Sequence, residues 1–172
     1  MLFRSDAGRI VAFHTEPTHA DRGPEDTAAR MGRAVHALAG RAGIAAADIA
    51  SVGLGTPGPQ DLARGVILRA GNLPGWDDFP IRDRVAAHSG HDVAYANDAT
   101  AAAYGEFWVG SGREFSSLVM LTLGTGVGGG IVIGDTALEG AHSHAAELGH
   151  IVVDASDTAR LCPFGHSRSE EH

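Results

Sequence analysis

Short apolar runs alternate with helical patterns over the first two thirds of the chain. Strands are predicted at residues 10–13, 52–55, 66–68 and 93–96, with helices between them at 25–39, 80–89 and 99–107. The first helix has Pro24 in its opening turn and glycines at its end, which is the usual polarity of helix signals. Strands that alternate with helices predict an α/β layer with parallel strands.

The pattern changes after a glycine loop at residues 110–112. Two apolar strands follow, at 118–123 and 131–133, and the glycine-rich stretch 124–130 joins them. This order predicts a β-hairpin that opens a second unit. We therefore expect a first lobe at residues 6–112 and the start of a second lobe at 113–167.

Composition restricts the class of protein. The chain has 172 residues, an apolar fraction of 44% and a formal charge of −8, which argues against a general nucleic-acid binder. No apolar run reaches the length of a membrane span, and the single cysteine, Cys162, excludes a disulfide framework. We expect a soluble cytoplasmic protein.

The two ends of the sequence look foreign to the rest. One codon choice for residues 1–5, ATGCTCTTCCGATCT, has a reverse complement that translates as Arg-Ser-Glu-Glu-His, the residues at 168–172. Opposed ends of this kind are typical of adapter sequence read on both sides of a short insert. Residues 1–5 and 168–172 are therefore interpreted as adapter-derived and set aside from fold reasoning.

Two stretches match the pattern Gly-x-Gly-x-x-Gly, at residues 53–58 and 124–129. A dinucleotide fingerprint needs a strand before the glycines and a helix after them, and neither stretch has that helix. Glycines between two strands can instead let backbone amides approach a phosphate. The alternative for 124–130 is a tight hairpin without a ligand, but its glycine content favours phosphate binding.

Five segments in a fixed order resemble the ROK family of sugar kinases and sugar-responsive repressors. They are Gly-Leu-Gly-Thr-Pro-Gly-Pro at 53–59, Asn-Leu-Pro-Gly-Trp at 72–76, Asn-Asp-Ala-Thr-Ala-Ala at 97–102, Leu-Gly-Thr-Gly-Val-Gly-Gly-Gly at 123–130 and Glu-Leu-Gly-His at 147–150. The resemblance implies an actin-like ATPase fold of the hexokinase type, with a sugar held between two lobes. It also implies ATP and Mg²⁺ as the phosphate donor and its metal.

The resemblance assigns a role to each segment. Asp98 is the candidate catalytic base, although an aspartate at a helix start can also act as a cap. The substrate-binding candidates are Asn72, Asn97, Glu147 and His150. The residues expected to face the ATP phosphates are Gly124, Thr125, Gly126, Gly128 and Gly129.

The sequence departs from the family at its expected zinc site. Many members bind zinc through the histidine of the Glu-x-Gly-His segment and a following cysteine cluster. Here His150 and Cys162 are present, but Phe164 stands where a second cysteine is expected. Two ligands cannot close a tetrahedral site, and His166 is not favoured as a substitute, so we expect that no zinc is bound.

The first phosphate loop of the family, Asp-x-Gly-Gly-Thr, is absent from the sequence. We therefore expect this fragment to be inactive or nearly so, while its intact parent phosphorylates a hexose. The resemblance also implies that the parent is a homo-oligomer. The Asn-Leu-Pro-Gly-Trp segment favours glucose as the hexose. The alternative is the sensing domain of a ROK repressor, which a basic helical domain ahead of Asp6 would indicate.

Overall fold

The computed structural model describes residues 1–69, 73, 75–124, 126–154 and 156. The chain divides into unit 1 (Met1–Asn97) and unit 2 (Asp98–His172), and each unit is described by itself. The lobe boundary expected at residue 112 lies inside unit 2, because the helix that precedes it packs on strands of that unit. Among the described residues, no helix is long and apolar enough to cross a bilayer.

Unit 1 contains two α-helices and six short strands within its described residues. In chain order they are β1 (Leu2–Arg4), β2 (Ile10–Phe13), α1 (Pro24–Ala42), β3 (Val52–Thr56), β4 (Gln60–Asp61), β5 (Val66–Ile67), α2 (Ile81–Ser89) and β6 (Val93–Asn97). Short 3-10 turns lie at Ala20–Arg22 and Ala46–Asp48. The strands and helices predicted from the sequence are all present, with ends that differ by a few residues.

The central pair of unit 1 is β3 with β6, which run parallel as predicted. Their register joins Val52 to Val93 at one end and Thr56 to Asn97 at the other. The strands β1 with β2 and β4 with β5 form separate antiparallel pairs. β1 uses residues 2–4, which the sequence analysis sets aside as adapter-derived, and they pair with β2 all the same.

The core of unit 1 lies against one face of the β3–β6 pair. Successive side chains of a strand point to opposite faces, so one face carries Val52 and Leu54 of β3 together with Val93 and Tyr95 of β6. These side chains pack against a buried cluster whose members are Ala28, Ile67, Trp76, Ile81 and Val85. The parallel pair is thereby held against both helices.

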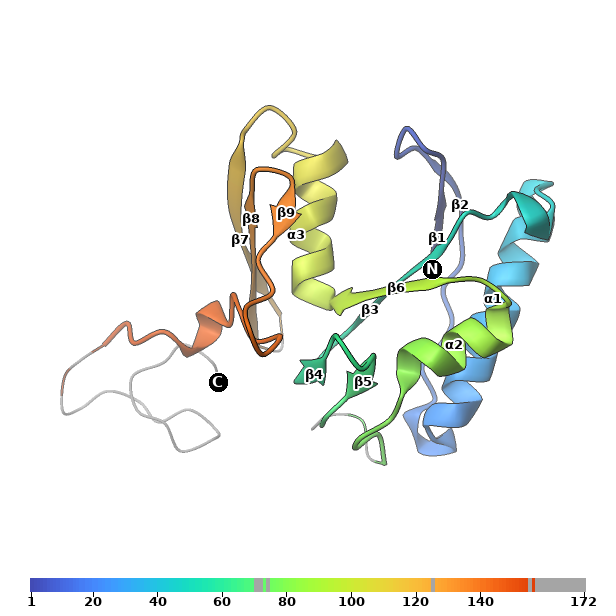
Figure 1. Cartoon of the computed structure of the whole chain (residues 1–172), viewed down its shortest axis with the longest axis horizontal. Coiled ribbons are helices and arrows are strands. Elements are labelled where there is room, and N and C mark those ends of the chain that lie inside the picture. The colour runs from blue at the N-terminus through green and yellow to red at the C-terminus, as the bar shows by residue number, and fades with distance from the viewer. Residues whose placement is uncertain (70–72, 74, 125, 155, 157–172) are drawn as a thin grey trace. The chain divides into compact units, whose positions relative to one another are not determined.

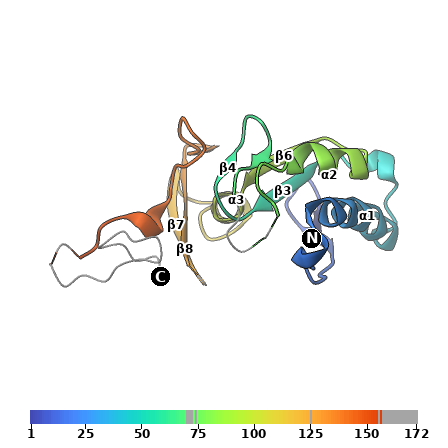
Figure 2. The same cartoon turned by 90° about the horizontal axis from the view of Figure 1, so that it is seen from below.

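Helix α1 has the terminal signals that its sequence predicts. Pro24 occupies the first turn with Glu25 and Asp26, and Gly43 ends the helix with a φ of 67°. Glycine is suited to that end because its lack of a Cβ allows a positive φ. Helices α1 and α2 lie side by side, as Figures 1 and 2 show from two directions.

The two helices approach most closely at Gly32. A Cβ on this residue would lie 2.5 Å from Cβ of His88 and 2.6 Å from its carbonyl carbon. At the rim of the same contact, Glu25 pairs with Arg84 at 3.2 Å and with His88 at 2.9 Å. The helix contact therefore depends on a residue without a side chain.

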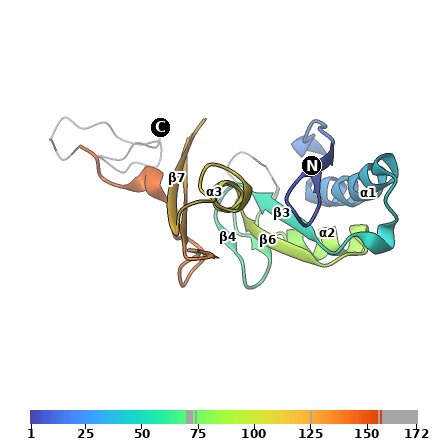
Figure 3. The ribbon, with the colours of Figure 1, turned by 90° about the horizontal axis from the view of Figure 1, so that it is seen from above.

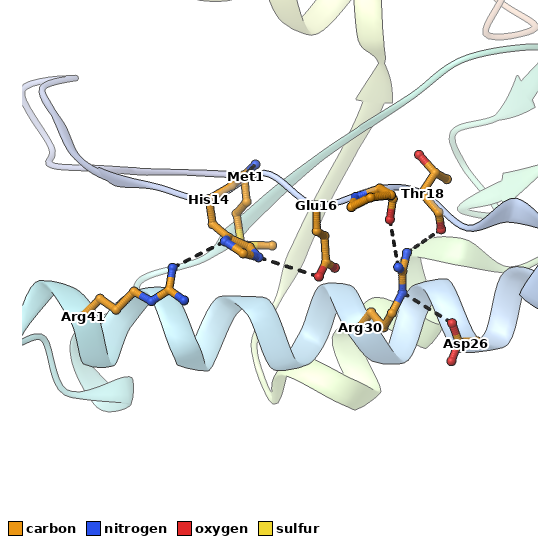
Figure 4. A network of polar contacts seen from close by, with 8 residues as sticks. Met1, His14, Glu16, Thr18, Asp26, Arg30 and Arg41 are labelled. Atoms are coloured by element: carbon orange, nitrogen blue, oxygen red, sulfur yellow. Dashed lines mark hydrogen bonds and ion pairs between the residues drawn. The ribbon is translucent and has the colours of Figure 1, made fainter.

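Arg30 ties the segment that precedes α1 to the helix. Its guanidinium donates to the carbonyl oxygens of Pro17, at 2.8 Å, and Thr18, and its Nε lies 3.4 Å from Asp26 (Figure 4). The Arg30 side chain is only 11% exposed, and bonds to a buried charged donor are stronger than neutral ones. The extended segment between β2 and α1 is thus held by a side chain of the helix itself.

Within its described residues, unit 2 is a three-stranded antiparallel sheet with one helix on it. Its elements are α3 (Asp98–Val109), β7 (Ser117–Leu123), β8 (Val127–Ile133), β9 (Thr136–Ala137) and a 3-10 turn at Leu148–His150. The sheet order is β7–β8–β9, and α3 runs along β7 and β8 (Figures 1 and 3). The predicted hairpin is confirmed.

The glycine-rich stretch is only partly a loop, which corrects the sequence-based expectation. Gly128, Gly129 and Gly130 pair with Thr122, Leu121 and Met120 as regular residues of β8. β7 ends at Leu123, and β8 begins at Val127. Chain reversal does not explain why three successive residues inside a strand are glycines. The close packing of other segments on β8 does explain it.

A hydrogen-bond chain closes the carboxyl ends of β3 and β6. The hydroxyl of Thr56 donates to Oε1 of Gln60 at 3.2 Å, and it lies 2.7 Å from the hydroxyl of Tyr95. Burial raises the pKa of Tyr95 above its ordinary value of 10.0, and the hydrogen bond with Thr56 lowers that pKa by a smaller amount. The folded state therefore favours the neutral phenol.

The substitutions Gly32→Ala and Gly40→Ala are expected to change stability in opposite directions. Gly32→Ala forces a methyl group against the α2 backbone and should lower the free energy of unfolding by about 1–3 kcal/mol. Gly40→Ala, in the same helix with nothing within 4 Å of its added Cβ, should raise it by about 0.5–1 kcal/mol. Denaturant unfolding of both variants tests this, and equal effects would contradict the close helix contact.

Stability should fall at alkaline pH because of Tyr95. The pKa of Tyr95 is higher in the folded state. Its contribution to the free energy of unfolding is therefore complete below about pH 10 and is lost as the pH rises through the folded-state pKa. All 13 basic side chains are arginines, so no lysine titrates in this range. Unfolding measured at increasing pH should show a smaller loss in Tyr95→Phe than in the unmutated chain.

Tyr104→Phe is the control for this prediction, because the Tyr104 side chain is 40% exposed on α3. This variant should keep the alkaline loss in full. If Tyr95→Phe and Tyr104→Phe lose stability with the same pH dependence as the unmutated chain, the buried phenol has no part in it.

Candidate functional site

Asp98 stands at the point where β6 passes into α3. It is the first residue of the helix and follows Asn97, the last residue of the strand, without a connecting loop. Its side chain is exposed, and Oδ1 accepts a hydrogen bond from the backbone N–H of Ala99 at 2.8 Å. A carboxylate here lies near the positive end of the helix dipole.

The bond to Ala99 is also what a helix-start aspartate makes for structural reasons. Both interpretations offered by the sequence, a cap and a base, are therefore compatible with the position of Asp98. An exposed carboxylate held by one oxygen can still accept a proton from a bound hydroxyl. Its role as a base stays a prediction.

One face of β8 receives the start of α3. A Cβ on Gly128 would lie 2.5 Å from Oγ1 of Thr122 and 3.1 Å from Cβ of Ala99. A Cβ on Gly130 would collide with Ala103 and lie 2.9 Å from the carbonyl oxygen of Ala99. The first turns of α3, which begin at Asp98, thus rest directly on strand glycines.

The opposite face of β8 receives the Glu-Leu-Gly-His segment. Gly129 points away from Gly128 and Gly130 in the alternation of the strand, and a Cβ on it would collide with the carbonyl oxygen of Ala146 and lie 2.7 Å from Cγ of Leu148. From the other side, a Cβ on Gly149 would collide with the carbonyl oxygen of Val127. Gly129 in the strand and Gly149 in the segment thus let the two stretches of chain pack closely.

Glu147 and His150 flank this contact. The 3-10 turn at Leu148–His150 places both side chains on the surface, and the backbone N–H of His150 donates to the carbonyl oxygen of Glu147 at 3.2 Å. The preceding residue, Ala146, has a φ of 63°, a conformation that residues with a Cβ seldom adopt. Such strain is common beside functional side chains.

The turn between β7 and β8 is the expected phosphate-binding element. The backbone N–H of Gly124 donates to the carbonyl oxygen of Gly126 at 3.0 Å, which closes the turn. An added Cβ on Gly124 would meet nothing within 4 Å, so the backbone there is open to a ligand. Thr125, between them, lies outside the described residues.

Unit 2 therefore brings three of the predicted segments onto one strand. The start of α3, the turn at 124–126 and the segment at 147–150 all adjoin the glycine half of β8. The phosphate role predicted for Gly128 and Gly129 stays a prediction, and the structure adds a packing role for both. The sequence analysis missed that role because strand glycines and loop glycines look alike in sequence.

Other predicted residues are not placed with this group. Asn72 lies outside the described residues, and Trp76, from the same sequence motif, is 2% exposed in the core of unit 1. Asn97 belongs to unit 1, where it is the cross-strand neighbour of Thr56. No signal in the sequence indicates the hydrogen-bond chain of Thr56, Tyr95 and Gln60 beside it. These three residues form no common motif, and Thr56 and Tyr95 lie 39 positions apart.

The described residues do not fit the zinc site of the family. They supply His150 from the expected ligand set, while Cys162, Phe164 and His166 lie outside the described part of the chain. Within that part, no group of three histidine, cysteine, aspartate or glutamate side chains is arranged to hold a metal ion. The expectation that zinc is lost stays a prediction.

Comparison of the sequence with known proteins gives a family match. The sequence profile of the ROK family matches residues 6–167, which are the residues between the two adapter-like ends. The chain is 36% identical over 158 residues to a glucokinase of Thermotoga maritima, covering 92% of this chain and 48% of that protein. It is 38% identical over 114 residues to a putative xylose repressor of Caldicellulosiruptor, covering 66% and 28%.

Two solved structures extend the likeness to the fold. A ROK hexokinase from Thermus thermophilus has a TM-score of 0.83 at 35% identity, with 95% of this chain and 52% of that chain covered. A ROK glucokinase from Streptomyces griseus, in complex with glucose and AMPPNP, has a TM-score of 0.74 at 34% identity, covering 96% and 50%. The chain thus spans about half the length of the proteins it matches.

The structural matches confirm the fold class that the sequence predicts, the actin-like ATPase fold of hexokinase type. The family profile covers nearly the whole chain, and the motif order, the parallel β3–β6 pair and the glycine-bearing β8 hairpin agree with it. This chain belongs to the ROK family.

Proposed function

We propose that the chain carries the catalytic base and the phosphate-binding turn of an ATP-dependent hexose kinase. The observation that supports this most is the packing on β8. The start of α3, which begins at Asp98, adjoins one face of this strand, and the segment at 146–149 adjoins the other face. Phosphoryl transfer needs a positioned hydroxyl, a base for its proton and donors for the phosphate charge. The segment with Glu147 and His150 suits positioning of the hydroxyl, Asp98 suits the role of base, and the turn suits binding of the phosphate.

Asp98 would accept the proton of the attacking sugar hydroxyl as the oxygen of that hydroxyl bonds to the γ-phosphorus and ADP departs. The Asp98 carboxylate suits this task, since it is exposed and already oriented by the N–H of Ala99. The proton ends on Oδ1 or Oδ2 of Asp98, and the phosphate ends on the sugar oxygen.

Asn97, Glu147 and His150 would hold the sugar. An amide offers a donor and an acceptor to neighbouring hydroxyls, a carboxylate accepts two hydroxyl hydrogen bonds, and an imidazole adds a donor or an acceptor. Each of these groups suits a polyol rather than an apolar ligand. Asn72 is a further candidate from the sequence alone.

The turn at 124–126 would bind the ATP phosphates through its backbone. The open space around Gly124 fits a bulky anion, and backbone N–H groups are good donors to phosphate oxygens. When bound with ATP, Mg²⁺ neutralises charge on the phosphate oxygens.

Glucose is the hexose that we favour, with phosphate transferred to its C6 hydroxyl. Support comes from the Asn-Leu-Pro-Gly-Trp segment, from the relatives named glucokinase, and from the Streptomyces griseus structure that holds glucose and an ATP analogue. This chain covers about half the length of each of these relatives, so the activity is proposed for a longer polypeptide. The 172-residue chain alone is expected to show no turnover.

The second candidate function is sugar sensing in a repressor. The likeness to the putative xylose repressor supports it. A sensor needs sugar-binding side chains but has no use for a base, and Asp98 therefore favours the kinase.

The substitution Asp98→Asn tests the proposal in a longer polypeptide that contains this sequence. Loss of the base should lower kcat for glucose phosphorylation by about 10²–10⁴-fold, while glucose affinity, measured by calorimetry, changes little. Asp135→Asn is the matched control, because Asp135 is an exposed aspartate of unit 2 in the turn between β8 and β9. Full turnover in Asp98→Asn would show that the base is another group.

A further inference from the structure

The carboxyl ends of β3 and β6 are linked by a hydrogen-bond chain that the proposed chemistry does not use. The hydroxyl of Thr56 donates to Oε1 of Gln60 at 3.2 Å and lies 2.7 Å from the hydroxyl of Tyr95. Thr56 and Gln60 are 3% and 1% exposed. We propose that this chain positions Asn97 for hexose binding, an inference that rests on the proposed function.

The three side chains form one connected set. Thr56 is its middle member, because its hydroxyl lies within hydrogen-bond distance of both Oε1 of Gln60 and the hydroxyl of Tyr95. Either hydroxyl can donate in the contact between Thr56 and Tyr95. Hydrogen bonds are directional, so they restrict each of these side chains to one rotamer more strictly than apolar contacts would.

Asn97 is coupled to this chain through the sheet. Thr56 is its cross-strand partner in the parallel register, and Tyr95 stands two residues before it on β6. Side chains two apart on a strand share a face, so Tyr95, Thr56 and Asn97 lie on the same side of the β3–β6 pair. Since Asp98 follows at once as the first residue of α3, no loop is available to absorb a shift of this strand end.

The arrangement is poorly suited to stability alone. Nε2 of Gln60 is buried and has no hydrogen-bond partner in the described residues, and burying an amide donor without an acceptor is unfavourable. A methionine of similar volume would avoid that cost at this site. The glutamine is explained if its amide oxygen is needed to orient Thr56 and, through it, the strand ends.

The experiment uses the longer polypeptide and compares hexose KM, ATP KM and kcat among variants. Thr56→Val removes the hydroxyl while keeping the shape, Thr56→Ser keeps the hydroxyl, and Tyr95→Phe removes the phenol hydroxyl. Val85→Ala is the control, because Val85 lies in the same core on α2 but outside the chain. Thermal unfolding of each variant shows that the protein assayed is folded.

Thr56→Val and Tyr95→Phe should each raise the hexose KM by about 10- to 100-fold, because small displacements of a positioned group have effects of this size. ATP KM should not change, Thr56→Ser should restore most of the hexose KM, and the double variant Thr56→Val with Tyr95→Phe should resemble either single variant. Val85→Ala should lower the unfolding temperature without changing the hexose KM.

An unchanged hexose KM in folded Thr56→Val or folded Tyr95→Phe would overturn the inference while leaving the proposed function in place. An equal rise in Val85→Ala would also overturn it, since the effect would then follow from stability. If the unmutated polypeptide phosphorylates no hexose, the proposed function fails, and this inference fails with it.

Discussion

Strand β8 can be contacted closely on both faces because three successive residues have no side chain. Gly128 and Gly130 admit the first turns of α3, and Gly129 admits the segment at 146–149. Any Cβ at these positions would meet backbone or side-chain atoms well inside van der Waals distance. The positions of Asp98, Glu147 and His150 in unit 2 all follow from this one packing constraint.

A related packing constraint acts in unit 1, at the ends of its two parallel strands. Thr56 and Asn97 stand side by side where β3 and β6 end, and the carboxyl ends of parallel strands are where α/β folds commonly place functional side chains. The polar chain from Tyr95 to Gln60 keeps these ends in register, while the apolar residues of the same face hold α1 and α2. Core packing and site geometry thus share one sheet face.

Much of this organisation could be predicted from the sequence, and there are physical reasons why the rest could not. Local signals identified α1, from Pro24 to the glycine that follows it, and the hairpin of β7 and β8. The sequence could not show that Gly128–Gly130 are strand residues, because glycine permits a loop and a closely packed strand equally. Nor could it show that Trp76 is buried rather than exposed in a site loop, or that Tyr95 meets Thr56, because both depend on contacts distant in sequence.

The most direct test is a crystal structure of the longer polypeptide with a hexose and a non-hydrolysable ATP analogue. The account predicts that the carboxylate of Asp98 lies within about 3.2 Å of a sugar hydroxyl, with Glu147 and His150 on the same sugar and the turn at 124–126 against the phosphates. A sugar bound away from Asp98, or phosphates held by other elements, would contradict it.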